Sequence, residues 1–372
     1  MRVIHIASNI SKNSGVMSVL MNYYRNINKK NIQFDFIYFD EYENTYKEEI
    51  QKLGGRFYKI TSPKNPYKFW RELKRILIEI EDENKIVHIH EIFLSLFLFN
   101  LKKITGIKKI IIHSHATKFS NKKLNSIRNR ILGIGNTFFS DILCACSFDA
   151  GINIFGKKFK KEGIVINNAI NLKKFCFNRE LRKELRRKFE LDEKYVIGHV
   201  GGFRPEKNHN FILDIFKEVL KQKQESILIL VGTGYLKEKI KLKCQKLNIE
   251  KNVIFLDLGE KNNVNEIMNI FDIFVFPSIY EGLGIVLIEA QATGIPCIFS
   301  DVIPKEANIL KENNRVLSLN LNEKYWAEEL LKLSNQKIKR DPLFIKEQID
   351  INGYNIEIES KKLEEFYLKN EK

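Results

Sequence analysis

The sequence is poor in cysteine, in long apolar runs and in internal repeats. Its five cysteines are an odd number in a chain of 372 residues, which argues against a disulfide scaffold and favours reduced thiols. The longest apolar stretch, residues 92–101, is about half of the roughly 20 residues that cross a bilayer, so no transmembrane helix is expected. The first residues read as a strand and lack the apolar core of a signal peptide. We therefore expect a cytoplasmic protein.

Acidic residues are also scarce, because 46 of them stand against 62 lysines and arginines, for a net charge of +16. Binding to a polyanion, a membrane surface or an anionic substrate would explain this excess of positive charge. Residues 92–140 contain no acidic residue. In the second half of this segment basic side chains interleave with apolar ones, which favours a surface that lies on anionic lipid, with a solvated helix face as the alternative. The candidate membrane or acceptor contacts are Lys118, Lys122, Lys123, Arg128 and Arg130, and residues 67–77, with Phe69 and Trp70, are a second candidate.

Along the chain, short apolar runs alternate with amphipathic stretches of helical periodicity. This pattern predicts βαβ units with parallel sheets, in an α/β fold of doubly wound domains. The expected strands are 3–7, 34–39, 86–89, 109–113, 141–146, 164–166, 196–200, 226–231, 253–256, 273–276 and 296–299. The alternation restarts after a basic stretch at residues 157–188, and the chain length corresponds to about two domains. We expect one domain at 1–175, a second at 176–355, and a charged amphipathic helix at 356–372.

The segment 271–301 carries the clearest chemical pattern. A predicted strand ends at residue 276, and the loop Glu281-Gly282-Leu283-Gly284 then opens a helix from about Ile285. Glycines at a helix N-terminus expose backbone N–H groups that suit a phosphate or sugar hydroxyls. Glu289 follows Glu281 by about two helical turns, so the two carboxylates could bind hydroxyls on different parts of one ligand. Taken alone, an ordinary helix start is the simpler explanation, but Glu289 has apolar neighbours and needs a partner.

Two further glycine turns follow predicted strands. Gly201 and Gly202 come after the strand 196–200 and precede Arg204 and Lys207, which makes a plausible cradle for a diphosphate. A surface turn with solvated charges is an equally good explanation in isolation. Gly232 opens a similar turn after the strand 226–231.

Taken together and in this order, these motifs resemble those of the family 4 glycosyltransferases, which are retaining enzymes. Ser14-Gly15, His88-Ile89-His90, His113-Ser114-His115 and the segment 165–170 extend the resemblance over residues 1 to about 305. It is closest in character to bacterial capsular and exopolysaccharide glycosyltransferases. The resemblance implies the GT-B fold, in which two Rossmann-like doubly wound domains face each other across a cleft, and a C-terminal helix that packs back on the N-terminal domain.

The resemblance also implies roles for individual residues. Glu289 would hold the ribose hydroxyls, Glu281 the donor-sugar hydroxyls, and Lys207 the departing diphosphate. The backbone at Gly282, Leu283, Gly284 and Ile285 would support sugar and phosphate, as would the turns at Gly201, Gly202 and Gly232. Gly15 would let the first loop approach the diphosphate, and His113, with His115 second, would lie near the donor sugar. The implied catalytic residues are thus His113, Glu281 and Lys207.

The implied reaction moves a hexose or N-acetylhexosamine from a nucleotide diphosphate sugar, expected to be a UDP-sugar, to a lipid-linked oligosaccharide. The enzyme would work peripherally on the inner face of the plasma membrane, without a metal and with no cofactor beyond its nucleotide-sugar co-substrate. One position departs from the family, which usually has arginine where this chain has Gly202. Arg204 has a long side chain that can reach the phosphates instead; without it, Lys207 and the backbone alone would stabilise the leaving group. The glycine at position 202 also leaves a catalytically inactive partner subunit of a glycosyltransferase complex as an alternative.

Two other readings start from the same residues. A nucleic-acid-binding protein would explain the positive charge, but no motif that reads RNA or DNA is present, and the paired carboxylates stay unexplained, so no nucleic-acid partner is expected. His88, His90, His113 and His115 could form a metal site, because His88 and His90 share one strand face. Packed or solvated histidines are the more ordinary reading, and we expect no metal.

Overall fold

The chain folds as two α/β units. The computed structural model describes residues 1–83, 85–98, 100–116, 123–257, 263–336 and 340–371. Unit 1 comprises residues 1–170 and 353–372, and unit 2 comprises residues 171–352. The boundary between the two units lies at residues 170 and 171, a few residues before the expected boundary near 175. The C-terminal segment that belongs to unit 1 begins at residue 353, whereas the sequence predicted residue 356.

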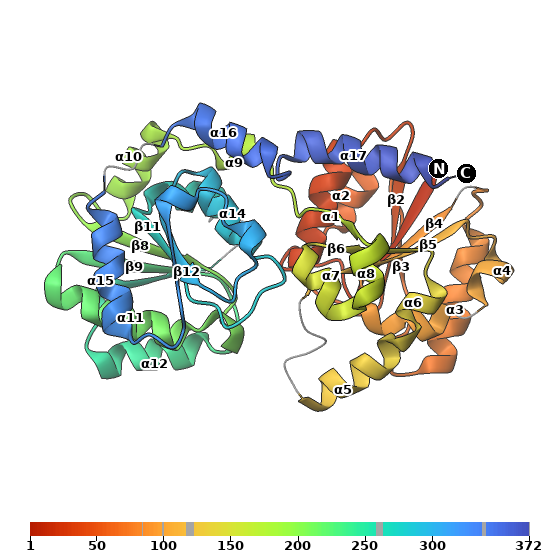
Figure 1. The fold of residues 1–372 in the computed structure, drawn as a ribbon, viewed down its shortest axis with the longest axis horizontal. Helices are drawn as coiled ribbons and strands as arrows, with labels where there is room; N and C mark the ends of the chain where they lie inside the picture. The colour runs from red at the N-terminus through yellow and green to blue at the C-terminus, as the bar shows by residue number, and fades with distance from the viewer. Residues whose placement is uncertain (84, 99, 117–122, 258–262, 337–339, 372) are drawn as a thin grey trace. The chain divides into compact units, whose positions relative to one another are not determined.

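Unit 1 is built on a seven-stranded parallel sheet of order β3-β2-β1-β4-β5-β6-β7, with helices on both of its faces (Figure 1). Its strands are β1 (Arg2–Ile6), β2 (Gln33–Tyr38), β3 (Phe57–Lys59), β4 (Ile86–Ile89), β5 (Lys109–Ser114), β6 (Ile142–Ala145) and β7 (Ile164–Val165). Its α-helices are α1 (Gly15–Asn26), α2 (Lys47–Lys52), α3 (Pro66–Glu79), α4 (Leu101–Thr105), α5 (Lys123–Leu132), α6 (Asn136–Phe139), α7 (Phe148–Phe155), α8 (Lys157–Glu162) and α17 (Ile356–Lys369). The central strands are buried along their length, which explains their continuous apolar runs.

The C-terminal helix α17 completes unit 1 by packing alongside α1 (Figure 1). Ile356, Leu363 and Tyr367 repeat at helical spacing and are buried, so they form its inner face. The Tyr367 hydroxyl and Nδ1 of His88 on β4 form a hydrogen bond of 2.7 Å. At the other end of the segment, Ile170 pairs with Asn355 in a parallel bridge. The last residues are therefore part of the core of unit 1.

Unit 2 is built on a six-stranded parallel sheet of order β10-β9-β8-β11-β12-β13. Its strands are β8 (Tyr195–Val200), β9 (Ser226–Val231), β10 (Val253–Leu256), β11 (Ile273–Phe276), β12 (Cys297–Ser300) and β13 (Asn314–Leu317). Its α-helices are α9 (Leu172–Phe175), α10 (Arg179–Lys188), α11 (His209–Gln222), α12 (Lys237–Leu247), α13 (Val264–Ile267), α14 (Ile285–Ala292), α15 (Glu323–Ser334) and α16 (Pro342–Ile351). Its core joins sheet residues such as Leu228 to Phe216 on α11 and Trp326 on α15.

Both sheets reverse their strand order at one point, between β1 and β4 in unit 1 and between β8 and β11 in unit 2. In open parallel sheets, ligands bind beyond the carboxyl ends of the strands at such a point. The glycine turns of unit 2 and the histidines of unit 1 lie at the ends of these strands and of their neighbours β9 and β5. Among the described residues, no helix is long and apolar enough to span a bilayer.

Candidate functional site

The first two glycine turns of unit 2 pack directly against each other at the carboxyl ends of β8 and β9. The amide of Gly201 donates to the carbonyl of Val231 over 2.9 Å. Gly232 has φ of +150°, and a Cβ there would lie 2.2 Å from the carbonyl oxygen of Gly201. Only glycine fits this contact, because a side chain would overlap the neighbouring backbone. The close packing fixes the shape of the predicted cradle.

Lys207 and Glu281, which are 74 residues apart in the sequence, form an ion pair in which Nζ and Oε1 are 2.5 Å apart. The side chains are only 18% and 14% exposed. Lys207 ends a short 3-10 helix (η3, Pro205–Lys207), and its ammonium also lies 5.0 Å from the centroid of the Phe276 ring. The two loops are joined by the amide of Ile279, which donates to the carbonyl of Glu206 over 2.8 Å. The structure thus brings together the predicted phosphate-binding cation and the predicted sugar-binding carboxylate.

Arg204 lies over the position where the family arginine is missing. A Cβ built on Gly202 would lie 3.6 Å from Nε of Arg204 and 3.4 Å from the carbonyl oxygen of Thr233, which are ordinary contacts. Arg204 is exposed, and no described residue makes a side-chain hydrogen bond or ion pair with it. Its guanidinium is therefore available for an anion on the glycine loop.

Helix α14 begins at the third glycine turn. Gly284 is its N-cap, with φ of +86°, and a Cβ there would lie 3.2 Å from the Phe276 ring. No acidic residue occupies the first turn of α14, so no carboxylate there offsets the positive end of the helix dipole. This geometry suits a phosphate or a sugar oxygen, as the sequence indicated for this loop and Ile285.

Glu289 is half-buried on the same helix, between the buried side chains of Ile288 and Ala290. Burial raises the pKa of its carboxyl to about 8. Among the described residues, no hydrogen bond to this carboxyl is present. A buried carboxyl without partners is unfavourable in its charged form. Hydroxyl groups of a bound ligand would supply the missing donors.

Two buried histidines below Lys207 were not expected from the sequence. His199 on β8 and His209 at the start of α11 have ring centroids 4.9 Å apart, and His209 stacks on Phe203. Burial and, to a smaller extent, the nearby Lys207 ammonium lower the pKa of His209 to about 4. A Cβ on Gly201 would lie 3.0 Å from Nε2 of His199. His199 and His209 therefore pack against the glycine turn at Gly201 and support it. The only sequence signal for this role was their position, at the end of β8 and the start of α11.

In unit 1, five histidines lie together at the carboxyl ends of β1, β4 and β5. His5 is directly opposite His88 in the strand register. Nδ1 of His5 is 2.9 Å from Nε2 of His90, and Nδ1 of His90 is 2.8 Å from Nε2 of His115. His113 stacks on His115 with ring centroids 4.0 Å apart. The sequence pointed to four of these residues and missed His5, although its place inside a buried strand next to β4 was a usable signal.

Burial keeps these imidazoles neutral. Burial lowers the pKa of His115 to about 4, and burial together with a smaller repulsion from His115 lowers the pKa of His5 to about 3. Burial also lowers the pKa values of His88, His90 and His113, and repulsion from the other histidines adds to it. At neutral pH each ring therefore carries a lone pair on one nitrogen.

Gly15 is the first residue of α1, which Ser14 caps by accepting from the amide of Met17 over 3.3 Å. A Cβ on Gly15 would meet no described atom within 4 Å. Packing within the described part of unit 1 therefore does not require glycine here, and the space beside it is open to a ligand.

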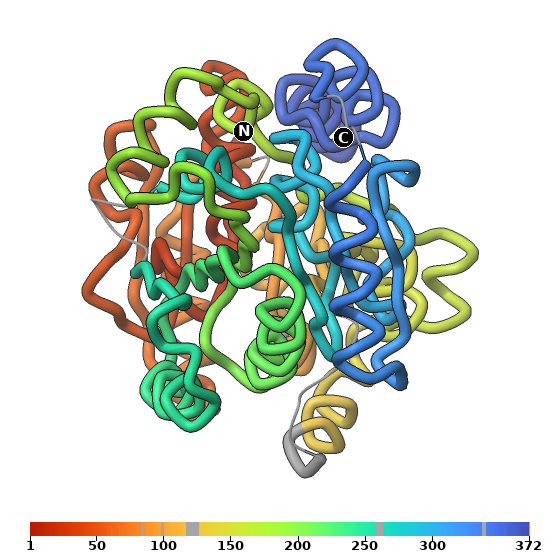
Figure 2. Tube along the Cα trace, turned by 90° about the vertical axis from the view of Figure 1, so that its left-hand side faces the viewer, coloured from red at the N-terminus to blue at the C-terminus, as the bar shows by residue number. Residues whose placement is uncertain are grey.

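The basic segment is only partly described, since Lys118 and Lys122 lie outside the described residues and Lys123 begins α5. Arg128 and Arg130 are both exposed. The helix projects from the body of unit 1 in both views (Figures 1 and 2). Exposed apolar residues recur along α5 and the two short helices after it: Ile127, Ile131, Ile134 and Phe138. The second candidate, residues 67–77, is wrong at Phe69, which is buried in the core.

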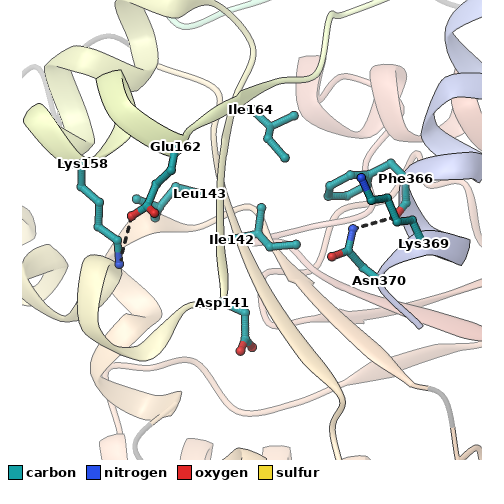
Figure 3. Close-up of a pocket in the computed structure, with 9 residues that line it drawn as sticks. All are labelled: Asp141, Ile142, Leu143, Lys158, Glu162, Ile164, Phe366, Lys369 and Asn370. Atoms are coloured by element: carbon teal, nitrogen blue, oxygen red, sulfur yellow. Dashed lines mark hydrogen bonds and ion pairs between the residues drawn. The ribbon is translucent and has the colours of Figure 1, made fainter. Parts of the chain in front are cut away.

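A pocket of about 270 Å³ opens elsewhere in unit 1, between the end of α17 and the strands β6 and β7 (Figure 3). Its lining residues are Asp141, Ile142, Leu143, Lys158, Glu162, Ile164, Phe366, Lys369 and Asn370. Lys158 and Glu162 form an ion pair of 3.9 Å at its rim. None of the predicted site residues lines it, so it is not the candidate site.

Comparisons with known proteins agree with this geometry. Residues 182–346 match the model of the family "Glycosyl transferases group 1". The chain is 32% identical over 365 residues to the putative glycosyltransferase EpsF of Bacillus subtilis, which covers 95% of this chain and 93% of that protein. It is 28% identical over 214 residues to the UDP-Gal:alpha-D-GlcNAc-diphosphoundecaprenol alpha-1,3-galactosyltransferase of Escherichia coli, which covers 55% of this chain and 53% of that protein.

Among solved structures, the chain resembles the crystal structure of Anabaena Alr3699/HepE in complex with UDP and glucose. The TM-score is 0.80 at 14% identity, over 98% of this chain and 99% of that one. A likeness at this identity concerns the fold, which is the GT-B fold expected from the sequence. The chain belongs to the group 1 glycosyltransferases.

Proposed function

We propose that this chain is a retaining glycosyltransferase that takes a hexose or an N-acetylhexosamine from a UDP-sugar. The observation that carries the proposal is the Lys207–Glu281 ion pair beside the N-terminus of α14. On the same helix lies the Glu289 carboxyl, which has no hydrogen-bond partner in the described part of the chain. A cation for phosphate and two carboxylates for hydroxyls match the chemistry of a nucleotide sugar. The E. coli relative is named for a UDP-sugar donor, which favours uridine.

The donor would bind at the carboxyl ends of the unit 2 strands. Its ribose hydroxyls would donate to Glu289, and its diphosphate would lie against the turns at Gly201, Gly202 and Gly232. Lys207 and Arg204 would neutralise the diphosphate oxygens. Because Lys207 is paired with Glu281 in the protein without ligand, the diphosphate would compete for the ammonium, and the Glu281 carboxylate would accept hydrogen bonds from the sugar hydroxyls.

With the donor bound in this way, the side chains of unit 2 can assist cleavage of the bond between the sugar and the diphosphate. As the bond between the anomeric carbon and the diphosphate oxygen lengthens, positive charge grows on the sugar and negative charge on the diphosphate. Lys207, Arg204 and the α14 amides stabilise the leaving group. The acceptor hydroxyl attacks from the face that the diphosphate leaves, and a phosphate oxygen takes its proton, so the anomeric configuration is retained. His113 of unit 1 would contribute at the donor sugar.

For the acceptor we propose a lipid-linked oligosaccharide of a bacterial surface polysaccharide, reached at the inner face of the plasma membrane. The E. coli relative is named for a sugar on diphosphoundecaprenol, which is such an acceptor. The exposed stripe of Ile127, Ile131, Ile134 and Phe138 beside basic side chains suits an anionic lipid surface. Flotation with vesicles of anionic lipid should carry the protein, and replacing Ile131 and Phe138 by serine should weaken this binding.

The first test is thermal unfolding with uridine, guanosine, cytidine and thymidine diphosphates. A ligand at 100 times its dissociation constant adds about 2.7 kcal/mol to the stability of the folded state. We expect uridine diphosphate to stabilise the protein and Glu289→Ala to lose most of the effect. Glu329→Ala, which removes a part-exposed carboxylate on α15, is the matched control and should keep it. If no nucleotide stabilises the protein, the donor site is not where we place it.

Turnover separates an enzyme from an inactive partner subunit. We expect UDP-sugar to be consumed with a polyprenyl-diphosphate sugar acceptor, and Lys207→Met to lower kcat by a factor of about 10² to 10³, as for the loss of one group that stabilises transition-state charge. The anomeric proton coupling in the product reports retention or inversion. Nucleotide binding without any transfer would favour the partner-subunit alternative.

A further inference from the structure

The histidine cluster of unit 1 contains more imidazole nitrogens than its hydrogen bonds use. Nε2 of His5, Nε2 of His88 and both ring nitrogens of His113 are buried without a partner among the described residues. A buried polar atom without a partner is unfavourable, and native proteins explain such atoms by a water, an ion or a ligand. Three of the five rings therefore have buried nitrogens that a ligand could satisfy, and His113 has two of them.

We propose that His90, His113 and His115 form a binding site for one divalent transition-metal ion of the zinc type. One nitrogen of each ring can be chosen so that the three lie within 4.8 Å of one another. In a tetrahedral zinc site with bonds of 2.0 to 2.1 Å, ligand nitrogens are about 3.4 Å apart. Rotation of the half-buried His115 side chain would bring the three to this spacing. The site lies next to the strand-order reversal of unit 1, where open parallel sheets bind ligands.

The hydrogen bonds around His90 orient it as a metal ligand. If Nε2–H of His90 donates to Nδ1 of His5 over 2.9 Å, Nδ1 of His90 is left with its lone pair toward His115. Metal-binding histidines regularly have their second nitrogen held in this way. His115 would move its proton from Nε2 to Nδ1, so each imidazole stays neutral and no net proton is released.

A second group of three, His5, His88 and His90, satisfies the same spacing but is less suitable. Nδ1 of His88 is bound by the Tyr367 hydroxyl, and all three side chains are almost completely buried. An ion needs an entry path, and only the first group has a half-buried member, His115. We therefore assign the ligands to His90, His113 and His115, with His5 as the residue that orients His90.

Three neutral imidazoles leave the fourth tetrahedral position open to solvent or to an anion. Imidazole ligands suit zinc, nickel, cobalt and copper, whereas magnesium and calcium prefer oxygen. The site goes beyond the transfer reaction as proposed above, in which no step involves a metal. A metal ion bound to His113 would keep this side chain away from the donor sugar, so zinc should inhibit transfer. This expectation rests on the proposed function, whereas the metal-binding test below does not depend on it.

The test measures metal retained by the untagged full-length chain in a Cys176→Ser background, which removes the exposed thiol as a competing ligand. After chelator treatment, loading with zinc and desalting, mass spectrometry of the metal should find about one ion per chain. Loading with magnesium should leave none. Cobalt in place of zinc should give a tetrahedral absorption spectrum without a thiolate charge-transfer band.

His115→Gln and His113→Gln should each lower metal retention at least tenfold. His209→Gln, which changes a buried histidine of unit 2 in the same chemical way, should leave it unchanged. Since His115 is half-buried, its variant should fold even if the His113 variant does not, and circular dichroism checks this. The proposal is overturned if the chelator-treated protein takes up no zinc, or if folded His115→Gln binds zinc as tightly as the parent.

Discussion

The glycine at position 202 offers a direct test of where the diphosphate binds. Its backbone does not require glycine, and a Cβ there makes only ordinary contacts, so Gly202→Arg should fold. A charge-assisted hydrogen bond from the new guanidinium to a phosphate is worth about 1.5–3 kcal/mol. Nε of Arg204 lies 3.6 Å from the new Cβ and has to move, which reduces the gain. With about 1.4 kcal/mol for each factor of ten, we expect uridine diphosphate to bind about tenfold tighter.

The assay is isothermal titration of uridine diphosphate at one fixed ionic strength, because the interaction is between charges. Arg204→Gln should weaken binding by about the same factor of ten, and Gly202→Arg combined with Arg204→Gln should return it to near the parent value. Gly202→Ala is the matched control and should change nothing. If folded Gly202→Arg and Arg204→Gln both bind like the parent, the turn does not contact the diphosphate, and our assignment of this loop fails.

Three further predictions follow from single residues. Burial raises the pKa of Glu289 to about 8, above its value in the unfolded chain, so the stability contributed by the protonated carboxyl should be lost as pH rises through 8. Between about pH 6 and 9 the melting temperature of Glu289→Gln should therefore fall less than that of the parent. An equal fall in the two proteins would contradict this. Gly232→Ala should destabilise unit 2 by about 2 kcal/mol or more in urea unfolding, whereas Gly202→Ala should be near neutral. Tyr367→Phe should cost about 1–2 kcal/mol because it removes the hydroxyl bound to buried His88, and a stability equal to the parent would refute that.

Much of the fold could be predicted because its signals are local. Buried parallel strands are short apolar runs, and nearly all of the predicted runs coincide with observed strands to within one or two residues. The strands β3 (Phe57–Lys59) and β13 (Asn314–Leu317) were missed because both are sheet-edge strands that carry polar residues. An edge strand buries less of its surface, so its apolar pattern is weak.

The residue types of the unit 2 site could also be predicted, because glycines and carboxylates at strand ends are visible in the sequence. The contact between Lys207 and Glu281 could not, since it depends on how two loops 74 residues apart meet. The position of Arg204 over Gly202 depends on a side-chain conformation that no spacing encodes. For the same reason His5 joined the other four histidines only when the order of β1, β4 and β5 in the sheet was known.

The division of the chain has a consequence for its synthesis. Unit 2 is one continuous stretch, whereas unit 1 consists of residues 1–170 and the last segment from 353. During translation residues 1–170 emerge first, and Tyr367, whose hydroxyl is hydrogen-bonded to buried His88, emerges only after all of unit 2. Domains generally fold as units while the chain is made. Unit 2 can therefore finish folding first, and the surface of residues 1–170 that packs against α17 stays uncovered until α17 has been synthesised.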